Sequence, residues 1–159
     1  MSDNIQNFIK ELAFEEALTE HLLHHGWNEV IKNPTEEQLV QNWANILYDN
    51  NRGIDKLGNF PLTKSEMQQV IDQVNLCDSP YVVNKLINGQ QISIKRDNED
   101  DTNNYGKEVY LKIFDPKEIS AGQSRYQIVR QPKFKTKEAI TGDRRGDLML
   151  LINGMPVVH

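Results

Sequence analysis

The chain has few of the features that mark secreted or membrane-bound proteins. It contains one cysteine, Cys77, among 159 residues, so no internal disulfide can form and a reducing compartment is expected. No stretch reaches the roughly 18 consecutive apolar residues that a membrane-spanning helix needs. The first four residues lack the basic and apolar regions of a secretory signal. These absences predict a soluble, cytoplasmic protein.

Two further kinds of motif are missing. The sequence has no glycine-rich phosphate loop of the nucleotide-binding kind, and no internal repeat or low-complexity stretch is visible. A length of 159 residues suits one domain with a substantial core. The sequence therefore predicts a single globular domain.

Positive charge is scarce overall, because the net charge is −5. It is nevertheless concentrated between residues 125 and 145, a stretch that contains seven basic residues and only two acidic ones. A basic strip of this kind is what a surface that faces phosphates needs, although lysines also protect exposed edge strands. The bases of this strip are Arg125, Arg130, Lys133, Lys135, Lys137, Arg144 and Arg145.

Helical periodicity dominates the first half of the chain. We expect a short helix over residues 2–12, a stronger one from Phe14 to His25 that stops at Gly26, and a last one from Ser79 to about Ile87. Two helices between them begin with capping boxes, one at Thr35 with Gln38 and the other at Thr63 with Glu66. Residues 1–88 are therefore predicted to be mainly helical.

Alternating apolar residues replace this period after Gly89. Strands are expected around residues 92–94, 109–113 and 126–130, with a short one beginning at Phe134. The acidic cluster from Asp97 to Asp101 is interpreted as a mobile loop. Helices first and strands afterwards predict an α/β (α+β) fold in which residues 89–159 form a mixed, mainly antiparallel sheet.

The end of the chain carries the main functional signal. An apolar run from Leu148 to Ile152, the pair Asn153-Gly154 and a second apolar run indicate a β-hairpin. Asp147 lies where the first strand begins. A carboxylate there is costly to bury unless it is paired or bound to a metal, whereas an aspartate beside a turn can simply remain in water.

These residues resemble a known family. Asp147, the five apolar residues after it, and the Asn-Gly-x-Pro stretch with its following apolar pair are similar to the nuclease core of the R (HsdR) subunit of type I restriction-modification enzymes. The stretch Phe14-Glu15-Glu16-Ala17-Leu18, followed by Gly26-Trp27, resembles the opening helix of that family and its acidic residue. The resemblance implies a restriction-endonuclease-like core of the PD-(D/E)xK superfamily.

In that family the second strand of the hairpin continues into Glu-x-Lys, which completes the catalytic site. The family spacing places this Glu two residues past His159 and the Lys four residues past it. The resemblance therefore implies that residues 1–159 are the N-terminal part of an endonuclease domain that stops before Glu-x-Lys. It also implies catalytic roles for Asp147 and Glu15, with Asp147 as a ligand of Mg²⁺.

The resemblance further implies double-stranded DNA as the substrate. The DNA-binding residues would be five bases of the strip, Lys133, Lys135, Lys137, Arg144 and Arg145. The methylation and specificity subunits of the restriction-modification complex would be partners, and ATP would be used by a DNA-translocating motor that lies outside this chain. A chain with one carboxylate ligand, or two if Glu15 takes part, should bind Mg²⁺ weakly, so we expect residues 1–159 alone not to cut DNA.

Strand geometry adds a condition on the hairpin. Side chains alternate between faces, so Asp147 and the family's Glu can share a metal only if strand pairing places them on one face. A two-residue Asn-Gly turn alone would place the Glu on the wrong face, whereas an odd loop or a bulge restores the match. We expect a three-residue loop from Ile152 to Gly154, with Gly154 left-handed. A tight two-residue turn would count against the metal site.

Other interpretations stay open. The chain could be a nuclease-fold module that docks DNA or another subunit without cutting, or an unrelated soluble interaction domain in which Asp147 is a turn residue. His21 and His25 share a helix face, as zinc ligands can, but no third ligand follows at useful spacing. A position at the helix C-terminus, where His favours the dipole, is the simpler explanation of both histidines.

Overall fold

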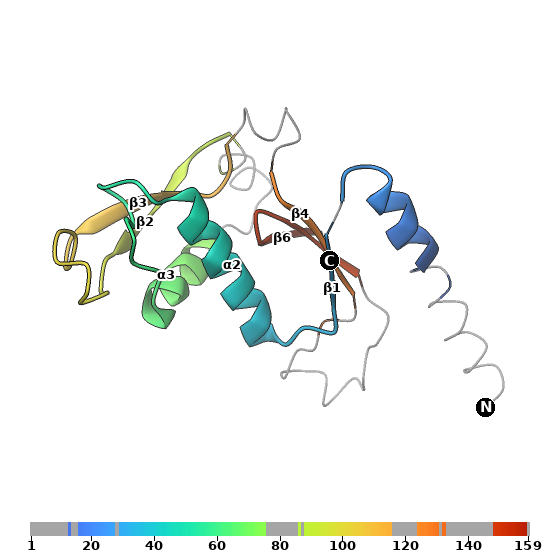
Figure 1. The fold of residues 1–159 in the computed structure, drawn as a ribbon, viewed down its shortest axis with the longest axis horizontal. Helices are drawn as coiled ribbons and strands as arrows, with labels where there is room; N and C mark the ends of the chain where they lie inside the picture. The colour runs from blue at the N-terminus through green and yellow to red at the C-terminus, as the bar shows by residue number, and fades with distance from the viewer. Residues whose placement is uncertain are drawn as a thin grey trace. The chain divides into compact units, whose positions relative to one another are not determined.

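A computed structural model of the chain describes residues 13, 16–27, 29–75, 86, 88–115, 124–130, 132 and 148–158. Its helices lie mostly in the N-terminal half and most of its strands in the C-terminal half (Figure 1). The predicted mixed α/β class is therefore confirmed. The elements in chain order are a helix at residues 16–23, β1 (Glu29–Lys32), α2 (Glu36–Asn50), α3 (Lys64–Asn75), β2 (Gln91–Lys95), β3 (Glu108–Lys112), β4 (Tyr126–Arg130), β5 (Leu148–Ile152) and β6 (Met155–Val158).

The chain divides into two compact units. Unit 1 consists of Met1–Leu39 and Arg125–His159, and unit 2 consists of Val40–Ser124. Unit 2 is thus an insertion, in sequence, between the first and the last part of unit 1. The assignment of residues 1–159 to one endonuclease domain stays a prediction.

Unit 1 contains a four-stranded mixed sheet in the order β1-β4-β5-β6. β1 and β4 are parallel, whereas β4 with β5 and β5 with β6 are antiparallel. The central strand β4 is buried on both faces, since both Ile128 and Val129 are fully buried. On one face, Ile31, Val129 and Met149 are successive cross-strand partners and form the core together with Leu151 and Leu39.

The helix that precedes β1 runs to residue 23, two residues short of the predicted end, and Gly26 terminates it as the sequence predicted. Gly26 has a φ of +98°, a left-handed conformation that glycine adopts without steric cost. The N–H of Trp27 donates to the carbonyl of Leu22 at 3.1 Å, which is the six-to-one hydrogen bond of a Schellman motif. Trp27 then packs edge-on against Tyr126 of β4, with ring centroids 5.3 Å apart.

Both predicted capping boxes are present. The Thr35 hydroxyl accepts from the N–H of Gln38 at 3.1 Å, and the Gln38 side chain accepts from the N–H of Thr35 at 2.9 Å. At α3, Thr63 and Glu66 form the same reciprocal pair, at 3.2 Å and 2.8 Å. These contacts satisfy helix N–H groups that have no partner within the helix.

Unit 2 contains a second, two-stranded sheet in which β2 and β3 are antiparallel. Isolated pairs of this kind are marginally stable, and here side chains bond to both edges. Gln69 and Gln73 of α3 bond to the backbone of β2. On the other edge, Asn51 bonds to the backbone of Lys112, and Lys56 donates to another carbonyl of β3. Burial, and then the charge of Lys112, lower the pKa of Lys56.

Several sequence predictions need a correction, and others concern residues that the structure does not describe. The strand β1 lies in the half predicted to be mainly helical and was not anticipated. The segment from Asp97 to Asp101 is a loop, as predicted, and it contains specific hydrogen bonds. The helix over residues 2–12 and the strand at Phe134 lie outside the described residues, as does the helix from Ser79, apart from Leu86.

Candidate functional site

A two-residue turn joins β5 to β6. Ile152 pairs with Met155, so the loop consists of Asn153 and Gly154. Their φ angles of +52° and +85° are left-handed at both positions, which is the geometry of a type I′ turn and the reason that Asn-Gly is favoured there. The predicted three-residue loop is therefore wrong. The left-handed conformation of Gly154 is confirmed.

Contacts with the chain before β4 hold this turn in place. The side-chain oxygen of Asn153 accepts from the N–H of Arg125 at 3.0 Å. The N–H of Asn153 donates to the carbonyl of Arg125 at 2.8 Å. Asn153 is buried, so its polar groups need these partners. The turn residue thus fixes the hairpin against the start of the central strand.

A β-bulge changes the register in the middle of the hairpin. Leu151 pairs with Pro156, but the adjacent Leu150 pairs with Val158. Val157 is therefore the extra residue on β6. A bulge of one residue shifts the pairing beyond it by one position. It makes the change of parity that the three-residue loop was predicted to make.

Pro156 sits where a proline is tolerated in this hairpin. The pair beside a two-residue turn, Ile152 and Met155, exchanges hydrogen bonds, and the next pair in an antiparallel ladder does not. Pro156 belongs to that next pair, so its missing N–H removes no bond between β5 and β6. The Asn-Gly-x-Pro stretch is therefore compatible with a tight turn.

None of the predicted site residues lies within the described part of the chain. This holds for Asp147 and Glu15, and for the five predicted DNA-binding bases Lys133, Lys135, Lys137, Arg144 and Arg145. Their proposed roles stay predictions. The structure does describe β5, which begins directly after Asp147 in the sequence.

One end of the sheet contains Leu148, the residue that follows Asp147 in the sequence. The parallel strands β1 and β4 finish there, at Lys32 and Arg130, which are Cα partners. Arg130 is in turn the Cα partner of Leu148, the residue directly after Asp147. The N–H of Asn33 donates to the carbonyl of Arg130 at 2.8 Å, which extends the bonding between these two strands past Lys32.

The side chains of Lys32 and Arg130 are cationic neighbours on one face of this sheet end. Lys32 is exposed and Arg130 is half-buried. The Nε atom of Arg130 is buried and has no hydrogen-bond partner among the described residues. A buried N–H without an acceptor is costly, so this guanidinium is suited to an acceptor group.

The opposite end of the sheet is neutralised within the protein. Arg125 donates to both carboxylate oxygens of Glu29, at 2.9 Å and 2.6 Å, and Gln127 donates to the same carboxylate at 2.9 Å. The hydrogen bond from Arg125 is the main reason that the pKa of Glu29 lies below its ordinary value, and the bond from Gln127 adds to this shift against the opposing effect of burial. Little uncompensated charge therefore remains at this end of the sheet to bind a ligand.

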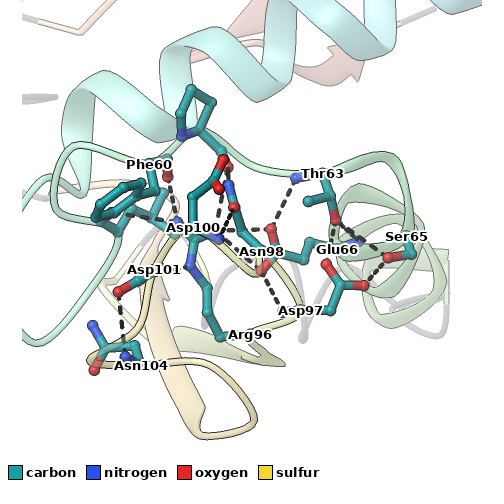
Figure 2. A network of polar contacts seen from close by, with 12 residues as sticks. Phe60, Thr63, Ser65, Glu66, Arg96, Asp97, Asn98, Asp100, Asp101 and Asn104 are labelled. Atoms are coloured by element: carbon teal, nitrogen blue, oxygen red, sulfur yellow. Dashed lines mark hydrogen bonds and ion pairs between the residues drawn. The ribbon is translucent and has the colours of Figure 1, made fainter.

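A polar network in unit 2 surrounds Arg96 (Figure 2). Arg96 and Glu66 are fully buried. The Nη1 atom of Arg96 donates to both oxygens of Glu66, at 2.8 Å and 3.0 Å, and its Nε donates to Asp101 at 3.0 Å. Its Nη2 donates to the backbone carbonyls of Leu57 and Phe60. Each guanidinium nitrogen is thus satisfied by protein acceptors.

The same network reaches the start of α3. Glu66 also accepts from the backbone N–H groups of Thr63 and Asp97, and the Asp97 carboxylate accepts from the hydroxyls of Thr63 and Ser65 (Figure 2). Because these groups satisfy one another, the cluster is an internal anchor that joins the loop before α3, the helix itself and the β2–β3 loop. We assign it no ligand.

The structure favours a capping role for the two histidines. The Nδ1 of His25 donates to the carbonyl of His21 at 2.7 Å, and the two rings lie 4.3 Å apart. Within the described ranges, no three His, Cys, Asp or Glu side chains gather as metal ligands would.

No helix in the described part of the chain is long and apolar enough to cross a membrane.

Sequence reasoning missed two features for identifiable reasons. β1 is only four residues long, and its partner β4 is remote in the chain, so no local pattern marks it. The buried network did have a signal, because Ile92, Ile94 and Arg96 occupy alternate positions and are all buried. An arginine that continues an inward-facing alternation must have buried partners.

Comparisons with known proteins agree with the resemblance found in the sequence. The family model described as "Type I restriction enzyme R protein N terminus" matches residues 8–159. The endonuclease subunit of a type I restriction enzyme from Staphylococcus saprophyticus is 32% identical over 153 residues, which cover 94% of this chain and 14% of that subunit. A subunit of the same kind from Staphylococcus aureus is 30% identical over 152 residues, with the same coverage.

The match therefore extends over nearly all of this chain, whereas the chain spans about 14% of the length of these relatives. A family model that matches residues 8–159 includes both units and the terminal hairpin. The chain belongs to the family of N-terminal regions of type I restriction enzyme R proteins.

Proposed function

We propose that this region supplies part of the nuclease centre of a type I restriction endonuclease subunit, and that the complete subunit cleaves double-stranded DNA with Mg²⁺. Asp147 would be the central carboxylate and Glu15 a second acidic group. The reaction would be hydrolysis of a phosphodiester bond. Membership of the R-protein family supports this proposal.

The register of the terminal hairpin is the observation that carries it. Beyond the bulge, Leu150 pairs with Val158. A ladder continued in this register brings the residue three before Leu150, which is Asp147, opposite the position three after Val158. That position is two past His159, where the family pattern places its Glu. Directly paired residues share a face, so the bulge favours two carboxylates on one side of the hairpin.

The proposed ligands fit Mg²⁺ in their chemistry. Mg²⁺ prefers hard oxygen ligands and is usually held by one or two carboxylates together with water and phosphate oxygens. Asp147 would hold the ion with the family's Glu, and Glu15 would stand near it. Bound there, Mg²⁺ would supply activation of a water molecule and stabilisation of charge on the phosphate.

Bases of the strip would hold the DNA. Lys133, Lys135, Lys137, Arg144 and Arg145 precede Asp147 in the sequence, and lysine and arginine contribute most of the affinity of proteins for the phosphate backbone. Such contacts position the duplex and carry no sequence information. Recognition of a particular site would come from the specificity subunit, which with the methylation subunit is a proposed partner.

The remaining parts of the proposal concern the longer protein. Its relatives are about seven times the length of this chain, given that the match covers 14% of them. An ATP-driven motor that moves DNA would lie in that further part. The complete enzyme would act in the cytoplasm, where incoming DNA is met.

An Asp147→Ala variant of the complete R subunit, assembled with its partner subunits, tests the proposal. We expect cleavage of a DNA plasmid with Mg²⁺ to fall to background, because the central metal ligand is lost. Residues 1–159 alone should not cut in the same assay, since they contain too few ligands. The matched control is Asp72→Ala, which removes a carboxylate of α3 in unit 2 and should leave cleavage unchanged.

Cleavage by the Asp147→Ala enzyme at the wild-type rate would show that this region is not the nuclease centre. A role in docking DNA or another subunit would then take its place. Cleavage by residues 1–159 alone, lost on Asp147→Ala, would contradict only the expectation that this part is inactive.

A further inference from the structure

We propose that Lys32 and Arg130 form a phosphate-binding pair that holds the DNA backbone at the end of the sheet where β5 begins. This inference rests on the proposed function, because it takes DNA as the ligand. Neither residue belongs to the five bases assigned to DNA above. The two come from strands β1 and β4, far apart in the sequence.

The geometry of the sheet places the two cations side by side. Lys32 and Arg130 are Cα partners in the parallel ladder, and partners on neighbouring strands lie about 4.8 Å apart and share a face. The hydrogen bond from the Asn33 N–H to the Arg130 carbonyl, at 2.8 Å, fixes the chain directly after Lys32. The pair is therefore held by backbone bonding on both sides of Lys32.

Two like charges in this position favour an anion between them. Like charges directly opposite each other in a sheet are destabilising, and a bound phosphate would remove that repulsion. In the described part of the chain, neither Lys32 nor Arg130 forms an ion pair, whereas Arg125 at the other end of β4 is paired with Glu29. Lys32 is exposed and Arg130 is half-buried, so a phosphate can approach the pair from solvent.

The alternation of faces argues against Asp147 as the partner of Arg130. Arg130 is paired with Leu148 and shares its face. Asp147 is one residue earlier, so in a continued strand its side chain would point to the opposite face. The carboxylate is then left for the metal and the guanidinium for a phosphate. An arginine is well suited to this role, because its planar fork matches phosphate oxygens.

Affinity for a labelled DNA duplex, measured by fluorescence anisotropy at several salt concentrations, tests the pair in the complete R subunit. We expect Lys32→Gln and Arg130→Gln each to weaken binding by about tenfold at moderate salt. The slope of log affinity against log salt should fall by about one for each side chain and by about two in the double variant. Arg130→Lys should keep most of the slope.

Lys95→Gln is the matched control, since it removes an exposed lysine from β2 in unit 2 and should leave affinity and slope unchanged. Thermal unfolding of each variant separates lost binding from lost folding. If Arg130→Gln fails to fold, Lys32→Gln still decides the matter, because Lys32 is exposed. Wild-type slope in Lys32→Gln, or in the folded double variant, would overturn the inference.

The proposed function is tested separately in the same protein. Asp147→Ala should abolish cleavage and leave the salt slope for DNA binding intact. Cleavage that survives Asp147→Ala would defeat the nuclease proposal, and the salt slopes of the Lys32 and Arg130 variants would still decide whether the pair contacts DNA.

Discussion

At the scale of single residues, Arg96 shows how a buried charge can organise a loop region. Its guanidinium contacts Glu66, Asp101 and the carbonyls of the loop before α3. Burying one cation with two carboxylates is costly unless every group is hydrogen-bonded, and here each guanidinium nitrogen is bonded. Asp101, at the end of the acidic run after Arg96, is therefore a counter-charge to the buried guanidinium.

Replacing Arg96 with Met should strongly destabilise the protein. The change leaves Glu66 and Asp101 buried without a cation, and breaking a buried pair in this way costs about 3–5 kcal/mol. Urea unfolding measures the loss in free energy of unfolding. Lys95→Gln, one residue earlier and exposed, should change it by less than about 0.5 kcal/mol. A loss below about 1 kcal/mol for Arg96→Met would show that the network contributes little.

Glu29 should make stability depend on pH in the acid range. Its pKa in the folded protein lies below the ordinary 4.5, chiefly because Arg125 bonds to the ionised carboxylate. The stabilisation is therefore complete above pH 4.5 and is lost as the pH falls through the folded-state pKa. The gap in unfolding free energy between wild type and Glu29→Gln should shrink in that acid range. The side chain is partly exposed, so the gap should stay below about 1 kcal/mol. A gap that is constant with pH would contradict this assignment.

At the scale of elements, the bulge in β6 decides which residues face each other across the hairpin. Deleting Val157 removes the extra residue and shifts the pairing beyond it by one position. We expect the complete R subunit with this deletion to lose cleavage by about 100-fold or more, since misplacing a catalytic group by about 1 Å can cost that much. Val157→Ala, which keeps the residue count, is the control and should retain activity.

The outcome depends on the register and not on the hairpin as such. The Asn153-Gly154 turn is untouched by the deletion, so the strands should still pair next to it. Wild-type cleavage by the deletion variant would show that the parity of the hairpin does not matter for activity.

Local signals predicted the elements they govern. Thr35 with Gln38 and Thr63 with Glu66 indicated two helix starts that the structure confirms, because a capping box depends only on residues three apart. The alternation at Ile92, Ile94 and later strands was equally local. The loop length was mispredicted because a loop with an odd number of residues and a bulge change the parity of the pairing in the same way, and the sequence pattern does not distinguish between them.

At the scale of the whole molecule, nonlocal pairing set the limit of prediction. The family resemblance and the mixed α/β class were found from the sequence and are confirmed. The pairing of Lys32 with Arg130 could not be predicted in that way. Parallel strands are joined by a long connection, and no local pattern around either residue indicates its partner strand. The predicted catalytic residues Asp147 and Glu15 stay predictions, since they lie outside the described residues.

The parallel pairing of β1 with β4 also has a consequence for how the protein is made. β1 ends at Lys32 and β4 begins at Tyr126, so a ribosome must synthesise all of unit 2 before the first strand can meet its neighbour. Closing so long a loop carries an entropic cost and slows folding. All residues of unit 2 are synthesised before β4. Unit 2 can therefore fold on the ribosome while β1 still lacks its partner strand β4.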